Sequence, residues 1–407
     1  MKELRLALVV QRYGDVVGGA ELLARQYAEK LNAEPNINLE VLTTTALDYV
    51  SWKNHFREGE TTISGVRVLR FRTNYSRNIF IFRTFHHLTY RVLKYFNLHF
   101  AGRGWLRPFE RIWYFLQGPN SKELISYIKE NSAGYDGFIF VTYLYAPTVF
   151  GLPLVADRSI LVPALHDEAS AYFYYTEILF KKARYIFANT RGEYDLICTL
   201  FPFAKIKTRV VGAGVNNNEP DQEWPENVPE GCRYILYLGR ISKGKGVLQL
   251  IKYYQQLVRE TGDNVKLVLA GKVDDTVRLP EEIIYTGFVS DTQKIKLLSN
   301  ARVVVNFSEY ESLSFIVLES LLLFKPVVVN RKSKVLDYYT QVTPTVYSFD
   351  SYNEFKEITI ELLKSEWQTT HSNELAASKK WVLENCSWSS IINQFRAAIE
   401  SINGVHH

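Results

Sequence analysis

Cysteine is scarce in this sequence, and ligand sets for metals are absent from it. Of 407 residues only three are cysteines, and no two of them have the Cys-x-x-Cys spacing of a zinc site. The chain has no Asp-x-Asp spacing and no cluster of carboxylates. We therefore expect a cytoplasmic protein that uses neither a metal ion nor another cofactor, with three buried, reduced thiols at Cys198, Cys232 and Cys386.

Long hydrophobic runs are also lacking. The apolar run near the N-terminus, Leu6–Val10, is too short for the core of a signal peptide. Gly137–Ala156 has no charge over a length that could span a bilayer, but it contains Pro147, Gly151 and Pro153. We predict a buried strand from Phe138 to Thr142, then a turn and a short helix, in a soluble protein.

What the sequence does contain is a repeated pattern of short apolar runs between longer amphipathic stretches. Hydrophobic residues make up 47% and charged residues 22%, which suits a globular protein, and the length suggests two or three domains. Continuous apolar strands separated by helices predict parallel sheets covered on both faces. The predicted strands are Leu6–Val10, Glu40–Thr44, Val66–Phe71, Gly137–Val141, Ile160–Val162, Tyr185–Ala188, Tyr234–Leu238, Lys266–Ala270, Ile283–Thr286, Val303–Asn306 and Val327–Asn330.

A segment rich in Asn, Pro, Gly and acids, 212–231, separates the two halves of this pattern. We predict an N-terminal domain (1–215), a linker (216–231), a C-terminal domain (232–385) and a final helical segment (386–407) that packs back toward the N-terminal domain. The predicted fold class is α/β, with two Rossmann-like, doubly wound domains facing each other across a cleft. Ligands of such sheets bind beyond the carboxyl ends of the strands, so the loops there should carry the chemistry.

Two of these loops have residues suited to phosphate. Gly18 and Gly19 stand between the first strand and the first helix, where backbone can approach a ligand closely. After Tyr234–Leu238, the chain continues Gly-Arg-Ile-Ser-Lys-Gly-Lys-Gly. This resembles a P-loop but has Gly246 where Ser or Thr would hold magnesium, and no later strand ends in the required Asp. We interpret Arg240 and Lys245 as a pair of cations for a diphosphate.

Two glutamates and a helix start form the third candidate. Glu311 precedes an apolar helix predicted to begin near Ser314, with Ser312 and Ser314 as caps. Glu319 lies inside that helix, where a carboxylate is costly unless it is paired or binds a ligand. The free N–H groups around Phe315 and Ile316 would face an anion. This combination suits a nucleotide sugar, with phosphate at the helix end and the two carboxylates on hydroxyl groups.

At this point the sequence resembles the retaining glycosyltransferases of family GT4, which have the GT-B fold. The resemblance is carried by Glu311-x7-Glu319 with Gly239-Arg240 and Lys245-Gly246 before it. It extends to further motifs in the same order along the chain: Gly18-Gly19-Ala20-Glu21, Val162 to Asp167, Asn189-Thr190, Gly214-Val215-Asn216, Thr286 to Val289, and Trp388 near the end. Two positions depart from the family's pattern. Serines stand at 312 and 314 where glycine is common, and Ala213 stands where asparagine is common.

The resemblance implies a role for each matching residue. Gly18 and Gly19 would approach the donor phosphates, and His166 would contact the donor sugar. Arg240 and Lys245 would bind the diphosphate, Glu311 the sugar and Glu319 the ribose, and Val289 would meet the base through its backbone. The implied catalytic set is Glu311, His166, Arg240 and Lys245; the implied donor-binding set is Gly18, Gly19, Arg240, Lys245, Val289, Ser314, Phe315, Ile316 and Glu319.

The implied reaction is transfer of a hexose with retention and without a metal. The expected donor is a UDP-sugar, with UDP-glucose first on family frequency alone, and the expected acceptor is a glycan or glycolipid in exopolysaccharide or cell-envelope synthesis. Two alternatives remain open: an epimerase or hydrolase of sugar nucleotides on the same fold, and a P-loop nucleotide switch.

The mildly positive net charge of +5 is concentrated in one segment. Residues 70–111 hold nine Lys and Arg against one acid, which gives 9 − 1 = +8 and leaves 5 − 8 = −3 for the rest. Eleven aromatic residues are interleaved with these charges. Three interpretations stay open: an ordinary packed insertion, a peripheral surface for anionic lipid at the inner face of the plasma membrane or for a lipid-linked acceptor, and, less favoured, a nucleic-acid surface.

Overall fold

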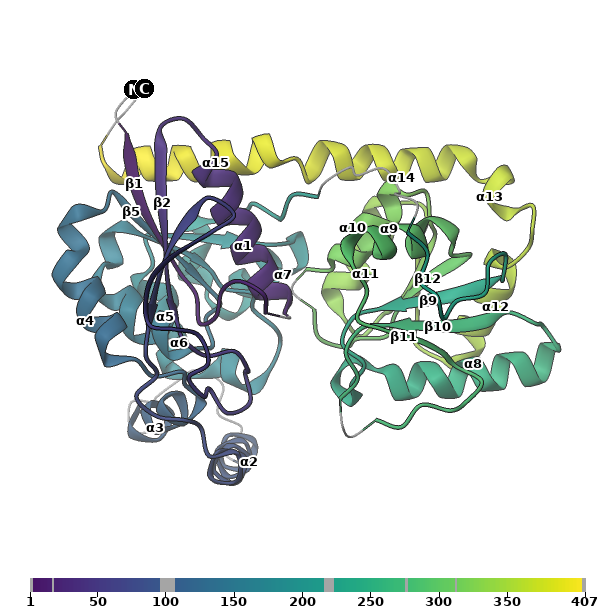
Figure 1. Cartoon of the computed structure of the whole chain (residues 1–407), viewed down its shortest axis with the longest axis horizontal. Helices are drawn as coiled ribbons and strands as arrows, with labels where there is room; N and C mark the ends of the chain where they lie inside the picture. Colours follow the sequence, from purple (N-terminus) through teal and green to yellow (C-terminus); the bar gives the residue numbers. More distant parts are fainter. Residues whose placement is uncertain are drawn as a thin grey trace. The chain divides into compact units, whose positions relative to one another are not determined.

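The structure, a computed structural model, describes residues 3–16, 18–95, 107–215, 223–274, 277–311 and 313–404, with the backbone alone for residues 92–95. It divides the chain into two compact units. Unit 1 comprises Met1–Ala213 and Trp388–His407, and unit 2 comprises Gly214–Ser387 (Figure 1). Residues 223–231 of the predicted linker belong to unit 2, where Val228 is buried in the core.

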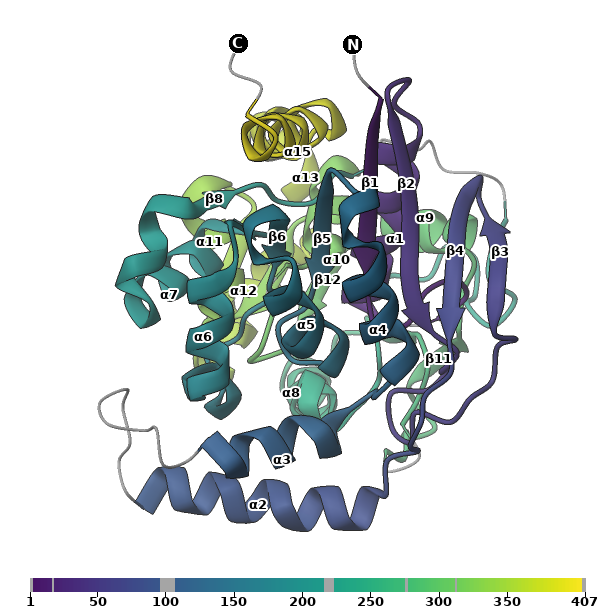
Figure 2. The same ribbon diagram turned by 90° about the vertical axis from the view of Figure 1, so that its left-hand side faces the viewer.

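Unit 1 is built on an eight-stranded sheet with the order β3-β4-β2-β1-β5-β6-β7-β8, parallel except for β3 at one edge. Figure 2 shows α4 to α7 on one face of this sheet, while α1 packs on the other face together with α15. The strands are β1 (Leu4–Val9), β2 (Ile37–Thr44), β3 (Gly59–Ile63), β4 (Val66–Phe71), β5 (Gly137–Val141), β6 (Ser159–Val162), β7 (Tyr185–Ala188) and β8 (Thr208–Val210). The helices are α1 (Gly19–Asn32), α2 (Ile79–Tyr95), α3 (Arg107–Gln117), α4 (Lys122–Asn131), α5 (Ala146–Gly151), α6 (Tyr174–Lys182), α7 (Arg191–Leu200) and α15 (Trp388–Ile402).

Unit 2 has a six-stranded, fully parallel sheet with the order β11-β10-β9-β12-β13-β14. One apolar core covers each face. The strands are β9 (Tyr234–Leu238), β10 (Lys266–Ala270), β11 (Ile284–Gly287), β12 (Val303–Asn306), β13 (Val327–Asn330) and β14 (Val346–Phe349). The helices are α8 (Val247–Thr261), α9 (Asp291–Asn300), α10 (Phe315–Leu322), α11 (Lys334–Val342), α12 (Tyr352–Leu362), α13 (Trp367–Thr370) and α14 (Ser372–Asn385).

The predicted α/β architecture is confirmed, and the predicted strands are present to within three residues at each end. The strands β3, β8 and β14 were not predicted; each lies at or next to a sheet edge, where the apolar run is short. Gly137–Ala156 forms β5 followed by the short helix α5, as predicted. Among the described residues, no helix combines the length and the apolar character that crossing a bilayer requires.

The chain returns to unit 1 through α15. Its first residue, Trp388, contacts Tyr27 of α1 edge to face, and Phe395 packs between Tyr27 and Phe187 of β7. An ion pair of 2.7 Å joins Arg396 to Glu34. The C-terminal helix is therefore part of the core of unit 1.

The prediction of three buried thiols is wrong for two of them: Cys386 is buried, whereas Cys198 and Cys232 are half-buried.

Candidate functional site

The candidate site of unit 2 lies where the strand order of its sheet reverses. β9 pairs with β10 on one side and with β12 on the other, so the loops after β9 and β12 leave the sheet side by side. Such a switch point is the usual ligand position in an open parallel sheet. Arg240 and Lys245 lie in the first of these loops, and Glu311 lies in the second. The topology thus brings together residues that are far apart in the sequence.

Gly246 fixes how closely the two loops approach each other. It precedes α8 in the left-handed conformation, with φ of 72°, and a Cβ atom added there would lie 2.2 Å from the carbonyl oxygen of Phe307. A serine or threonine, which a P-loop needs at this position to bind magnesium, cannot fit without moving the backbone. The geometry therefore opposes the P-loop alternative.

Lys245 and Glu311 form an ion pair across the two loops. The distance between Lys245 Nζ and Glu311 Oε1 is 2.7 Å, and the Glu311 side chain is the more buried of the two. Arg240 is half-buried in the same loop, and its carbonyl oxygen accepts a hydrogen bond of 2.8 Å from the Tyr237 hydroxyl. The pairing holds the carboxylate in place and leaves the ammonium group partly open to solvent.

The start of α10 lies next in the same loop. Ser314 occupies the N-cap position, but the prediction that its side chain caps the helix is wrong. The Ser314 hydroxyl instead accepts a hydrogen bond of 3.2 Å from the Asn306 side chain, which lies at the end of β12. A helix start has N–H groups without partners inside the helix, here those of Phe315 and Ile316, both half-buried. The other predicted cap, Ser312, lies outside the described residues.

Glu319 lies on α10 and is paired with a residue that the sequence did not single out. Lys294 of α9 contacts Glu319 Oε1 at 2.7 Å and Asp291 at 3.3 Å. The second carboxylate oxygen of Glu319 is buried without a hydrogen-bond partner. Burial raises the pKa of Glu319, and the attraction of Lys294 opposes this shift. Val289 precedes Ser290, the N-cap of α9, so its backbone lies two residues before the helix that carries Lys294.

Unit 1 holds the remaining predicted residues. Gly18 is the residue before α1, and Gly19 is its first residue. A Cβ atom at Gly18 would lie 2.0 Å from Oε2 of Glu21, so a larger residue there would displace that carboxylate. Glu21 is buried and ion-paired to Arg12 at 2.6 Å. This pair fixes the turn that follows β1.

His166 follows β6 on a turn held by a buried carboxylate. Glu193 of α7 accepts hydrogen bonds from the backbone N–H groups of Leu165, at 2.6 Å, and Asn189, at 2.7 Å. Ala164, two residues before His166, has a positive φ of 51°, which is strained for alanine. Sequence reasoning missed Glu193, although Thr190-x-x-Glu193 is the spacing of a capping box and Thr190 does accept from Glu193 N–H.

The buried carboxyl group of Glu193 leads to a prediction about how the stability of the protein depends on pH. Burial raises its pKa from 4.5 to about 8, against the backbone hydrogen bonds that lower it. The folded protein therefore holds this proton more tightly than the unfolded chain does. The resulting stabilisation is complete below pH 4.5 and is lost as the pH rises through about 8. Between pH 5 and 8, the free energy of unfolding should fall less with pH in Glu193→Gln than in the wild type, as measured by denaturant titration. Parallel curves for the two proteins would contradict this assignment.

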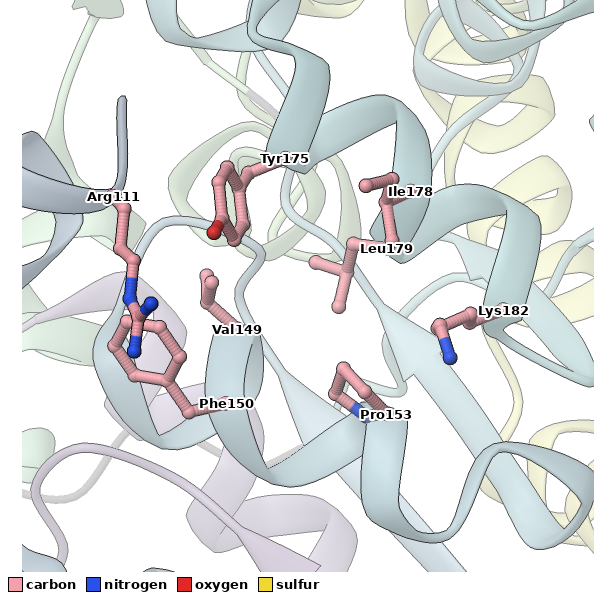
Figure 3. Close-up of a pocket in the computed structure, with 8 residues that line it drawn as sticks. All are labelled: Arg111, Val149, Phe150, Pro153, Tyr175, Ile178, Leu179 and Lys182. Carbon is pink, nitrogen blue, oxygen red and sulfur yellow. The ribbon is translucent and has the colours of Figure 1, made fainter. Parts of the chain in front are cut away.

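A further cavity lies in unit 1, and none of the predicted catalytic or donor-binding residues lines it. It has a volume of about 300 Å³ and is bounded by α3, α5, the turn after α5, and α6 (Figure 3). Its walls are mostly apolar, and it has one cation from α3 and one from the end of α6. The lining residues are Arg111, Val149, Phe150, Pro153, Tyr175, Ile178, Leu179 and Lys182.

One comparison with known proteins relates most of unit 2 to a described family. Residues 218–380 match the family of glycosyl transferases group 1. An uncharacterized glycosyltransferase of Methanocaldococcus jannaschii is 25% identical over 227 residues, which is 50% of this chain and 57% of that protein. The chain spans about half the length of the curated relatives it matches.

Two solved structures share the fold over nearly the whole chain. Sucrose-phosphate synthase from Thermosynechococcus elongatus superimposes with a TM-score of 0.70 at 16% identity, covering 99% of this chain and 100% of that one. Anabaena Alr3699/HepE, solved in complex with UDP and glucose, gives a TM-score of 0.65 at 15% identity over 98% of this chain and 100% of that one. At these identities the likeness concerns the fold.

Proposed function

We propose that this chain, whose residues 218–380 match the family of glycosyl transferases group 1, transfers a hexose from a UDP-sugar, UDP-glucose first, to a hydroxyl group of a glycan or glycolipid. Both units have the α/β architecture of the GT-B fold. The observation that carries the proposal is the Lys245–Glu311 pair at the β9/β12 switch point, directly before the start of α10. The Anabaena structure with UDP and glucose supports the choice of donor.

The donor would use both members of this pair. Lys245 and Arg240 would bind the diphosphate together with the N–H groups of Phe315 and Ile316, because each of them favours negative charge. For Lys245 to do so, its ammonium group has to exchange the Glu311 carboxylate for phosphate oxygens or share itself between them. Glu311 would then be free to hold the sugar. The unpartnered oxygen of Glu319 is the acceptor that we assign to a ribose hydroxyl, and the backbone at Val289 would contact the base.

The proposed chemistry begins with cleavage of the bond between the sugar and the diphosphate. The negative charge that develops on the departing phosphate is met by Arg240, Lys245 and the start of α10. Glu311 stabilises the positive charge that develops on the sugar without forming a lasting covalent bond. The acceptor hydroxyl attacks from the face that the phosphate leaves and gives its proton to the departing phosphate oxygen, which retains the anomeric configuration. We assign Gly18 and Gly19 to the donor phosphates and His166 to the donor sugar. No metal ion enters these steps.

For the acceptor, we propose a glycan or a lipid-linked saccharide used in exopolysaccharide or cell-envelope synthesis. The enzyme would then work as a cytoplasmic protein bound peripherally to the plasma membrane. The basic and aromatic segment 70–111 supports this location.

Thermal shift with UDP, GDP, dTDP, ADP and ATP tests the donor assignment. A nucleotide that binds only the folded protein raises the unfolding temperature in proportion to its binding free energy. We expect the largest shift with UDP, a smaller shift with ADP and ATP, and loss of the UDP shift in Lys245→Met. Stabilisation by ATP alone would contradict the proposal, as would a UDP shift that Lys245→Met leaves unchanged.

A further inference from the structure

The helices α2 and α3 each expose large apolar side chains. These two helices lie side by side at one edge of unit 1 (Figure 2). The exposed fraction reaches 81% for Phe80 and is close to one half for the others. We call this set, together with the exposed arginines of the same helices, the outer surface of α2 and α3. Its apolar members are Phe80, Ile81, Leu88, Phe109, Ile112 and Phe115.

The opposite side of α2 packs against α3. Phe82 and His86 contact Trp113 of α3, at ring-centroid distances of 5.9 and 6.0 Å. Phe85 and Tyr90 also pack on the cluster that contains Trp113. An ordinary surface helix pair has this packed side and a polar outer side. Here the outer side is also apolar, and the packing of unit 1 does not explain it.

The charge of the outer surface has one sign. Arg83, Arg91, Arg107 and Arg111 are exposed. The sequence from Arg72 to Gln117 contains one acid, Glu110. Its side chain is buried and accepts hydrogen bonds of 3.0 Å from the backbone N–H groups of Tyr174 and Tyr175. Arg103 lies outside the described residues, as does the side chain of Lys94. Arg83 and Arg91 are therefore exposed with no exposed carboxylate among the described residues of α2 and α3, whereas Arg107 lies over the ring of Tyr174 and Arg111 lines the cavity.

The apolar character continues beyond α3. Arg111 lies at the rim of the cavity of about 300 Å³ whose other walls come from α5 and α6, and Lys182 lies at its far end (Figure 3). Glu177, the one acid of α6, is half-buried and ion-paired with Lys181. The surface thus combines protruding rings, a recess with apolar walls, and cations at the border of both.

We propose that the outer surface of α2 and α3 binds the headgroup layer of an anionic lipid membrane. Apolar side chains that protrude beside arginines suit this layer, because the rings and aliphatic groups enter the acyl boundary while the guanidinium groups contact phosphates. Ile81, Leu88 and Ile112 favour lipid over nucleic acid, since aliphatic side chains do not stack on bases. A second copy of the chain would set like charges against each other. The inference rests on the proposed function only in that a lipid-linked acceptor would be presented at this surface.

Co-sedimentation with vesicles tests the proposal on the full-length protein. Two vesicle compositions are compared: phosphatidylcholine alone, and phosphatidylcholine with 30% phosphatidylglycerol. We expect binding to the anionic vesicles and little to the neutral ones. Arg83→Ser with Arg91→Ser should weaken binding by about 30-fold, given the contribution of each cation near an anionic surface. Phe80→Ser with Leu88→Ser should weaken it by about ten-fold or more, because large apolar groups are removed.

A matched control comes from the same unit. Lys205 and Ile206 are both exposed, Ile206 at 95%, but they lie on the turn before β8. Lys205→Ser with Ile206→Ser should bind vesicles like the wild type. The UDP thermal shift is measured for every variant without vesicles, so folding and donor binding are followed separately. A wild type that responds to UDP but does not bind anionic vesicles would overturn this inference and leave the proposed function standing. Equal weakening by the control pair, stronger binding to a polyuridine RNA than to vesicles, or dimerisation that the Phe80 and Leu88 changes abolish would also overturn it.

Discussion

Replacing Glu311 by glutamine is expected to lower the rate of sugar transfer by about two to three orders of magnitude, the size of effect seen when one preorganised electrostatic group is removed from a transition state. Glutamine is nearly isosteric but carries no charge, so it cannot stabilise the positive charge that develops on the sugar. The same change releases Lys245, whose ammonium group is 2.7 Å from the carboxylate. Affinity for UDP should therefore be unchanged or higher. Steady-state turnover and calorimetric titration with UDP give the two numbers.

Glu309 offers the matched control. It lies two residues earlier in the same loop and is paired at 2.9 Å with Lys332, near the surface. Glu309→Gln should keep turnover within about two-fold, as a solvent-exposed ion pair contributes little. If Glu309→Gln loses as much activity as Glu311→Gln, or if Glu311→Gln keeps the wild-type rate, the role proposed for Glu311 is wrong.

The second large effect is expected on stability. Gly246→Ser should lower the free energy of unfolding by about 3 kcal/mol or more, because left-handed backbone costs a residue with a Cβ atom about 1–2 kcal/mol and displacing packed backbone adds to it. The new Cβ atom would lie 2.2 Å from the carbonyl oxygen of Phe307. The substitution completes the sequence of a P-loop, yet we expect neither magnesium binding nor tighter ATP binding to follow. Denaturant titration measures the loss of stability, and thermal shift with Mg-ATP, compared with the wild type, checks that no ATP binding is gained.

Substitutions at two other glycines distinguish the energetic cost of backbone strain from that of steric overlap. Gly262 has a φ of 66° and nothing within 4 Å of an added Cβ atom, so Gly262→Ser should cost about 1 kcal/mol from backbone strain alone. Gly244 has neither the positive φ nor a close neighbour, so Gly244→Ser should be near neutral. If Gly246→Ser lowers the free energy of unfolding no more than Gly262→Ser does, the contact with Phe307 is not tight.

The fold could be predicted from the sequence because each central strand is a continuous apolar run between amphipathic helices. The strands β9, β10, β12 and β13 were predicted with the bounds that the structure gives. β3 could not be, since four of its five residues are exposed and its sequence, Gly-Glu-Thr-Thr-Ile, has no apolar pattern. Its place in the sheet depends on antiparallel pairing with β4, and pairing is a property of the fold.

The site was predictable in its charged residues but not in their partners. The spacing of Glu311 and Glu319 drew attention to α10, yet nothing in the sequence pointed to Lys294, which is 25 residues before Glu319. Its position follows from the packing of α9 on α10. In the same way, Ser314 is a residue type that often caps a helix, but its hydroxyl oxygen accepts a hydrogen bond from the Asn306 side chain instead. Which side chains form hydrogen bonds and ion pairs depends on distances in the folded structure, and a sequence pattern does not contain them.

The central claim is that the protein transfers glucose from UDP-glucose with retention and without a metal ion. Proton NMR of the reaction tests this claim most directly. The purified protein is incubated in EDTA with UDP-glucose and, in parallel, with the GDP-, dTDP- and ADP-sugars, with and without a simple sugar acceptor. We predict consumption of UDP-glucose, release of UDP, and a first-formed product with the α-configuration of the donor, none of which Glu311→Gln produces at a comparable rate. A first-formed β-product, a reaction that stops in EDTA and resumes with manganese, or no turnover of any of the four donors would contradict the account.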